Sequence, residues 1–147
     1  MTIKLSSLKV DLEREQQGDW IDYPEWPGVR FNVSSINKPA YMTARDVLMA
    51  RLVRKHKKNV PPEVMTSEFG RLYAEHLLHG WEGLDEEYTP ERARTVLTDP
   101  SYREVVKAVE WCAGQVAQVD AEFVEDAAKN SGQPSGGGRK AAEQTAG

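Results

Sequence analysis

The 147 residues are enough for one domain of ordinary size, which can bury an apolar core without disulfides or metals. The single cysteine, Cys112, excludes a disulfide framework within the chain and favours a reducing compartment. No stretch approaches the length of an apolar membrane span or of a signal peptide, so we expect a soluble cytosolic protein without a membrane partner.

The formal net charge of -4 is unevenly distributed along the chain. Residues 30–58 are strongly basic, with Asp46 as their one acidic side chain, whereas residues 82–126 are strongly acidic. Such asymmetry steers association with a charged partner, and another copy of the same chain would qualify.

In chain order, residues 1–17 are polar with weak periodicity, and we expect them to be loosely ordered. The stretch GDWIDYPEWPGVRFNVSS predicts a β-hairpin, because alternating apolar residues flank the turn PEWPG. A lone hairpin is marginal in water, so its aromatic face must pack against another element.

From Pro39 onward the apolar period becomes helical, and a first helix is predicted to run to about Lys57. A second helix follows the prolines 61 and 62, and Gly80 is expected to end it as a glycine just past the last periodic residue. Thr89-Pro90-Glu91 is typical of a helix start and predicts a short helix from Pro90 to Leu97.

Asp99-Pro100 repeats the helix-start signal, and an apolar stripe from Tyr102 to Ala127 then predicts a C-terminal helix of near thirty residues. The expected fold is therefore mainly α, with about four helices, an N-terminal β-hairpin and a long C-terminal helix. We expect a single domain over residues 18–130, followed by a flexible Gly/Ser/Ala-rich tail over residues 131–147.

The residue types that most often carry chemistry do not form a convincing site. His76 and His79 share a helical spacing with one acid nearby, but zinc requires three or four convergent ligands. Cys112 falls inside an apolar stripe, where packing explains it. The basic stretch RLVRKHK reads as a solvated helix end more readily than as a nucleic-acid site. We therefore expect no enzyme activity, no cofactor, no metal and no nucleic-acid partner.

The four tryptophans are the more unusual feature. Trp is enriched at interface hot spots because it offers a large contact area at low entropic cost. Trp81 has a structural explanation, as a plug beside the bends at Gly80 and Gly83, and Pro90 and Pro100 are assigned structural roles as helix starts. The residues we expect to bind a partner come from the hairpin, the basic helix and the last helix: Trp20, Trp26, Phe31, Arg51, Lys55 and Trp111.

The order of these segments resembles the tail assembly chaperones of long-tailed, siphovirus-like bacteriophages. An aromatic hairpin precedes a basic helix, and AEHLLHGWEGL is followed by YTPERARTVLTDPSYREVVKAVEWCAGQVAQ and AAKN. The resemblance extends over roughly residues 18–130.

The resemblance implies a helical protein without enzymatic activity that binds the tape measure protein and keeps it soluble while the tail tube assembles. It implies action in the host cytoplasm, absence from the mature virion, possible contact with the tail tube protein, and a homo-oligomer. Family members commonly have a longer product made by ribosomal frameshifting, and codons for Ala128-Lys129-Asn130 permit a slippery heptamer.

Three other classes of function remain open from the sequence. One is a structural tail-completion or head-tail connector protein, which would stay in the virion. Another is a nucleic-acid-binding regulator acting through the basic helix, whose binding would weaken steeply with salt. The third is a metal-dependent hydrolase using His76 and His79, which elemental analysis would reveal.

Overall fold

The computed structural model describes residues 1–125, which form two compact units. The larger unit runs from Val10 to Gln118, and the smaller joins Met1–Lys9 to residues 119–125. The tail expected at residues 131–147 and the frameshift-compatible residues 128–130 lie outside the described residues.

The larger unit contains a three-stranded antiparallel sheet in the order β2-β3-β4, built from Asp19–Asp22, Arg30–Val33 and Leu78–Glu82. The predicted hairpin is confirmed as β2 and β3, which pair Ile21 with Phe31. Phe31 in turn pairs with Trp81 of β4, so these three side chains share one face of the sheet. That face is the apolar one, and Trp20, Arg30 and Glu82 lie on the other.

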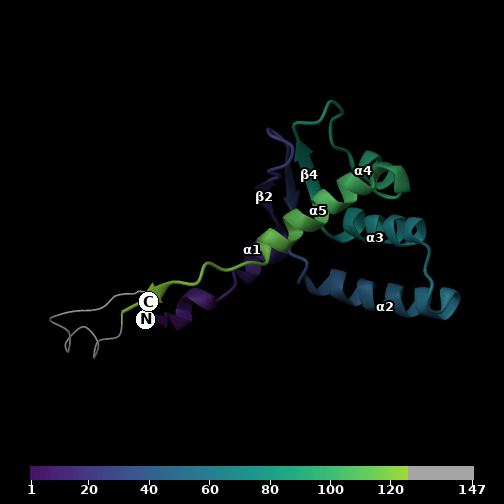
Figure 1. Ribbon diagram of the computed structural model, residues 1–147. Helices are drawn as coiled ribbons and strands as arrows, with labels where there is room; N and C mark the ends of the chain where they lie inside the picture. The colour runs from purple at the N-terminus through teal and green to yellow at the C-terminus, as the bar shows by residue number, and fades with distance from the viewer. Residues whose placement is uncertain (126–147) are drawn as a thin grey trace. The chain divides into compact units, whose positions relative to one another are not determined.

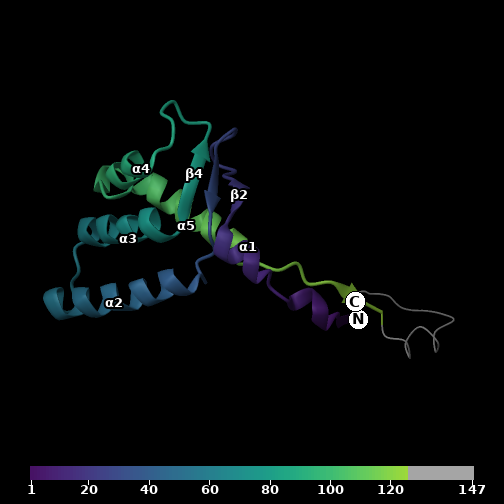
Figure 2. The same ribbon diagram turned by 180° about the vertical axis from the view of Figure 1, so that it is seen from behind.

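Helices pack against the apolar face of this sheet and against one another (Figure 1). The helix α5, Arg103–Val116, contacts β2 and β3, and α3, Pro62–His76, packs on α5. The remaining helices of this unit are α1, Leu12–Gln17, α2, Pro39–His56, and α4, Pro90–Leu97. From behind, α2 and α4 are seen along opposite sides of α3 (Figure 2).

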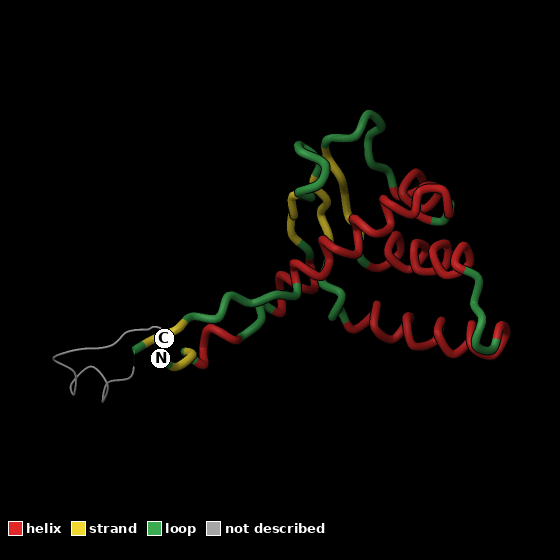
Figure 3. The backbone as a smooth tube through the Cα atoms, in the orientation of Figure 1, coloured by secondary structure: helices red, strands yellow, loops and turns green. Residues whose placement is uncertain are grey.

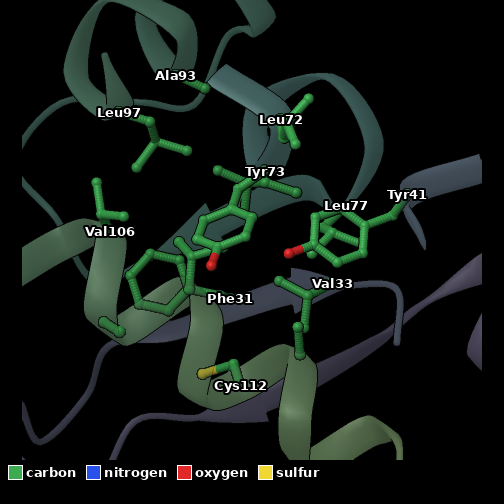
Figure 4. Close-up of a cluster of buried hydrophobic side chains, with 14 of the residues drawn as sticks. Phe31, Val33, Tyr41, Leu72, Tyr73, Leu77, Ala93, Leu97, Val106 and Cys112 are labelled. Carbon is green, nitrogen blue, oxygen red and sulfur yellow. The ribbon is translucent and has the colours of Figure 1, made fainter. Parts of the chain in front are cut away.

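The core lies where α3, α4 and α5 meet the sheet (Figure 4). Phe31 and Val33 from the sheet and Leu97 from α4 have no exposed surface. Tyr73 of α3 packs its ring 5.8 Å from that of Tyr41 of α2, which attaches α2 to the same core. Burial of large apolar side chains of this kind contributes about 1.5–3 kcal/mol each.

The prediction that the second helix extends to Gly80 is wrong for its last turn. The helix α3 ends at His76, and the chain then continues as strand β4 (Figure 3). As a strand, this segment buries Leu78 and Trp81 and adds ladder bonds to β3. Gly80 is therefore a strand residue, and Trp20 packs over it at 3.4 Å from the place a Cβ would occupy.

The prediction of a long C-terminal helix is also wrong. The short 3-10 helix η2, Pro100–Tyr102, leads into α5, which ends at Val116. Val116 is the last residue of the stripe that the core can bury. A helix continuing beyond it would have no tertiary packing to support it, and isolated helical turns are marginal in water.

The smaller unit consists of a 3-10 helix, η1, Leu5–Leu8, and a two-stranded antiparallel sheet. The sheet pairs β1, Thr2–Ile3, with β5, Phe123–Val124, and we call it the terminal ribbon. Residues 1–17, expected to be loosely ordered, thus contain β1, η1 and α1 in the structure.

The expected fold class, a mainly helical domain of about four helices with one hairpin, is corrected accordingly. The described residues contain five α-helices and two small sheets, which is a mixed α/β architecture. Two elements account for the change, because β4 and β5 both replace segments that were expected to be helical.

Candidate protein-binding grooves

A groove between α3 and α5 is the first candidate site. Its apolar lining comes from Met65, Phe69 and Tyr73, spaced four apart on α3, and from Val106 of α5. The spacing places the α3 side chains in one row, since residues four apart on a helix lie one above the other. The groove has a volume of about 270 Å³, which accommodates one or two side chains of a partner.

The rim of this α3–α5 groove is charged. Arg103 and Lys107 lie on α5 one turn apart, and Glu110 follows one turn later. The hydroxyl of Tyr73 donates a hydrogen bond of 3.1 Å to Oε2 of Glu110, and burial raises the pKa of the Tyr73 phenol well above its usual range. The groove therefore combines an apolar floor with two exposed cations and one carboxylate that is already bonded.

A second groove lies between α2 and α3 and has a volume of about 380 Å³. Arg51 and Lys55, both predicted to bind a partner, line it together with Val64 and Pro100. The structure thus brings together two of the residues that the sequence selected. We call this the α2–α3 groove.

The charges of the α2–α3 groove are partly neutralised within the chain. Nη2 of Arg51 lies 3.2 Å from Oε1 of Glu68, and Nη2 of Arg71 lies 3.0 Å from the same oxygen. Burial alone would raise the pKa of the Glu68 carboxyl, but these two guanidinium groups outweigh it and hold the pKa below its usual range. Lys55 is therefore the more available of the two predicted cations.

An aromatic cluster joins the hairpin turn to α5. The ring of Tyr23 lies 4.9 Å from that of Trp26 and 5.7 Å from that of Trp111, both edge-on. Trp111 retains 40% of its surface exposed. From the sequence, Trp26 and Trp111 were predicted to bind a partner, but Tyr23, which lies between them, was not. Its position in an alternating aromatic segment was nevertheless visible in the sequence.

The other two predicted aromatic contacts lie elsewhere. Trp20 is on the opposite face of the sheet, where the guanidinium of Arg30 stacks 4.6 Å from its ring centroid. Phe31 is fully buried in the core, so we correct its assignment to a partner-binding surface. The alternation that suggested an exposed aromatic face instead marks a buried one, because α5 packs on the hairpin and β4 pairs along the edge of β3.

The residues given structural roles occupy turns and strand or helix boundaries. Trp81 is buried in β4, and its Nε1 donates to the carbonyl oxygen of Glu86 at 2.7 Å. Gly83 has φ of +93°, and a Cβ there would meet the Gly28 carbonyl oxygen at 2.2 Å. Pro90 begins α4 behind a Thr89 cap, and Pro100 begins η2 behind an Asp99 cap.

The histidines do not share a helix face. His76 ends α3, whereas His79 lies in β4, opposite the irregularity between Asn32 and Val33. Nε2 of His79 is 2.7 Å from Oγ of Ser34, whose hydroxyl donates to the Gln16 carbonyl oxygen, so His79 is the donor. Within residues 1–125 no three His, Cys, Asp or Glu residues are grouped as metal ligands would be.

Cys112 is enclosed in the core, and its Sγ lies 3.9 Å from the carbonyl oxygen of Ile21. Burial raises the pKa of its thiol to about 12. Such a thiol stays protonated near neutral pH, and the thiolate is the reactive form. Cys112 is thus a packing residue, as its position in the stripe indicated.

The helices of residues 1–125 include none with the length and apolar character that a membrane span requires.

These observations define a small α/β protein whose described surface offers two helix-lined grooves and an aromatic cluster. Residues 36–130 match the family described as YdaY prophage protein, and the match covers more than half of the chain. The chain therefore belongs to the YdaY prophage protein family and is a phage-derived protein. Comparisons with curated proteins and with solved structures gave no match. The matched segment begins after β3, so β2 and β3 lie outside it.

Proposed function

We propose that this prophage protein is a tail assembly chaperone, which binds the tape measure protein and keeps it soluble while the tail tube assembles. The proposal is that it acts by reversible binding, without enzymatic chemistry and without a cofactor. It would work in the host cytoplasm and be absent from the mature virion, with the tail tube protein as a further contact.

The observation that carries the proposal is the α3–α5 groove. A row of Met65, Phe69 and Tyr73 beside Val106 presents apolar surface at helical spacing, which suits the apolar face of a partner helix. Met65 and Phe69 are only half-buried within the chain, so a partner side chain would remove further apolar area from water. Met is adaptable in shape and suits a binding surface that accepts varied side chains.

Charge supports a client with acidic flanks. Arg103 and Lys107 at the rim keep 70% and 63% of their side chains exposed. Their partner in the chain is the exposed Glu104, and surface pairs of this kind are worth little. The two cations therefore remain able to meet acidic residues that flank an apolar stripe on the client.

The α2–α3 groove offers a second contact of the same type through Lys55. Two grooves on neighbouring helices allow one long client to be held at two places, and linking two weak contacts raises the total affinity without tightening either one. Weak individual contacts suit a chaperone, because the client must leave when the tube subunits assemble.

The test is co-expression with the tape measure protein encoded beside this chain, followed by pull-down and a measurement of soluble client. We expect the client to co-purify and its soluble fraction to rise several-fold. Lys107→Glu should reduce capture through the α3–α5 groove, and Lys55→Glu should do so through the α2–α3 groove. Arg54→Glu is the matched control, because Arg54 is exposed on α2 and lines neither groove.

A well-folded chain that neither binds nor solubilises the client would refute the chaperone proposal. Detection of the chain in purified virions would favour a tail-completion or head-tail connector protein instead. Binding of DNA or RNA that weakens steeply with salt and is lost with Lys55→Glu and Arg54→Glu alike would favour a nucleic-acid-binding regulator.

A further inference from the structure

The smaller unit, which comprises η1 and the terminal ribbon, exposes far more apolar surface than its size explains. None of its described residues is buried, and Leu5 and Phe123 keep 81% and 56% of their surface exposed. Together with Ile3, Leu8 and Val124, they expose on the order of 500 Å² in all, with Ile3 and Phe123 on one face of the sheet and Val124 on the other. An isolated two-stranded ribbon is marginally stable in water, so this unit needs a further strand or surface.

The ribbon also has hydrogen-bonding groups directed outward. The Lys4 amide donates to the Glu122 carbonyl oxygen at 2.7 Å, and Ile3 pairs with Phe123 next to it. Antiparallel pairs alternate between bonded and non-bonded, so the amide and carbonyl of Ile3 and of Phe123 face the two outer edges. Within residues 1–125, neither residue has a backbone bond to any element outside the ribbon.

The two edges carry opposite charge. Lys4 directly follows β1, whereas Glu122 and Glu125 directly flank β5. Nζ of Lys4 already lies 3.5 Å from Oε1 of Glu122 within the ribbon. Pairing β1 with a second β1 through Ile3 would place Lys4 opposite Thr2, and pairing β5 with a second β5 through Phe123 would place Glu122 opposite Val124. Only pairing of β1 with β5 places opposite charges across from each other, which stabilises a strand pair.

We propose that the outer edge of β1 pairs with the outer edge of β5 from a second copy of this chain. In this antiparallel arrangement Ile3 lies opposite Phe123 of the second copy, and Lys4 lies opposite Glu122 of the second copy. The register is the one that the chain already uses within its own ribbon. Ile3 and Phe123 of the second copy then share one face of a continuous sheet, and their contact removes part of their exposed apolar surface from water.

The contact is heterologous, since each copy contributes a different edge, and so it can repeat from copy to copy. Repetition gives a ring if the rotation closes and an open filament if it does not. The inference is independent of the proposed chaperone function, because the purified chain is tested without a client.

Sedimentation velocity of the full chain over a wide concentration range provides the test. We expect self-association that weakens as salt is raised, because part of the contact is ionic. Ile3→Pro removes the outward amide while leaving the inner bonds of Lys4 intact, since proline is tolerated where the amide faces solvent. It should lower the measured mass to that of the monomer, whereas Ile3→Val, the matched control, should self-associate like the wild type.

Mixing two blocked variants tests which edges meet. Phe123→Pro blocks the β5 edge, so this variant alone should also be monomeric. An equimolar mixture of the two proline variants should give a one-to-one pair, because each retains the edge that the other lacks. Circular dichroism and the melting temperature verify that both variants keep the fold of the larger unit.

Charge reversal gives a second measurement that leaves every backbone amide in place. Lys4→Glu and Glu122→Lys should each weaken association at least tenfold, and the double variant should restore it. A wild-type chain that is monomeric at all concentrations overturns the inference. The inference is also overturned if self-association survives in both proline variants, or if the Phe123→Pro variant still self-associates on its own.

Discussion

The close approach of α3 to α4 at Gly70 makes a strong prediction about stability. A Cβ at Gly70 would lie 1.6 Å from the carbonyl oxygen of Leu97 and 2.6 Å from its carbonyl carbon. An ordinary carbon–oxygen contact is about 3.3 Å, so Gly70→Ala requires the two backbones to separate by roughly 1.7 Å. The obstacle is the backbone of the fully buried Leu97 at the end of α4, which cannot rotate away as a side chain would.

Two opposing terms decide the magnitude. Replacing glycine by alanine inside a helix stabilises it by about 1 kcal/mol. Overpacking a core costs typically about 1–3 kcal/mol and occasionally more. Since a backbone atom must move and Leu97 leaves its packed position, we expect the second term to dominate. Gly70→Ala should lower the free energy of unfolding by about 2 kcal/mol net, a large share of the ~5–15 kcal/mol typical of a domain.

Gly114 in α5 provides the matched control, because a Cβ there would meet no atom within 4 Å. Gly114→Ala should therefore raise the free energy of unfolding by up to about 1 kcal/mol. Urea unfolding followed by tryptophan fluorescence measures both variants in one assay. If Gly70→Ala is as stable as the wild type with an unchanged denaturant slope, the α3–α4 packing described above is incorrect.

Three further predictions concern single side chains. Tyr73→Phe should cost about 1 kcal/mol of unfolding free energy, because it removes the hydrogen bond to Glu110; no change in urea unfolding would argue against that bond. Burial, and then the charge of a nearby lysine, holds the pKa of His79 below 6.5, so the unfolded chain binds the extra proton first as pH falls. The free energy of unfolding should thus fall as pH drops below about 6.5, and His79→Gln should flatten that part of the pH profile. Cys112 should react with a thiol reagent at pH 8 only after unfolding, and rapid labelling of the native chain would contradict its burial.

The sequence was sufficient where the determining signal is local. The cap and proline at Thr89-Pro90 predicted α4 with its bounds, and the structure shows the cap as a bond from the Arg92 amide to the Thr89 hydroxyl. The hairpin was equally visible, since its turn residues and its alternation are adjacent in the chain.

The sequence was insufficient where a distant partner decides the conformation. LLHGW can end a helix or form a strand, and the choice depends on β3, which is far upstream. In the same way, Val119 and Phe123 continue the apolar stripe of α5, yet Phe123 pairs with Ile3 at the other end of the chain. Long-range pairing of this kind overrides a local period.

The candidate grooves were predictable in part. Arg51 and Lys55 were selected from charge and do line a groove, whereas Met65 and Phe69 were visible only as an apolar stripe. Whether a stripe is covered depends on how closely α3 and α5 approach, and no local pattern encodes that distance. Phe31 illustrates the opposite error. It was predicted to lie on a binding surface because it belongs to an aromatic strand, but it is fully buried in the core.

The order of the strands has a consequence during synthesis on the ribosome. The hairpin β2–β3 is made first, and β4, which completes the sheet, follows about 45 residues later, roughly 2 to 9 s at ordinary translation rates. Throughout that interval Phe31 and Val33 belong to a nascent chain that lacks β4 to complete the sheet and α5 to cover them. A lower translation rate in the host therefore prolongs the time during which this hairpin is accessible to cellular chaperones and prone to aggregation.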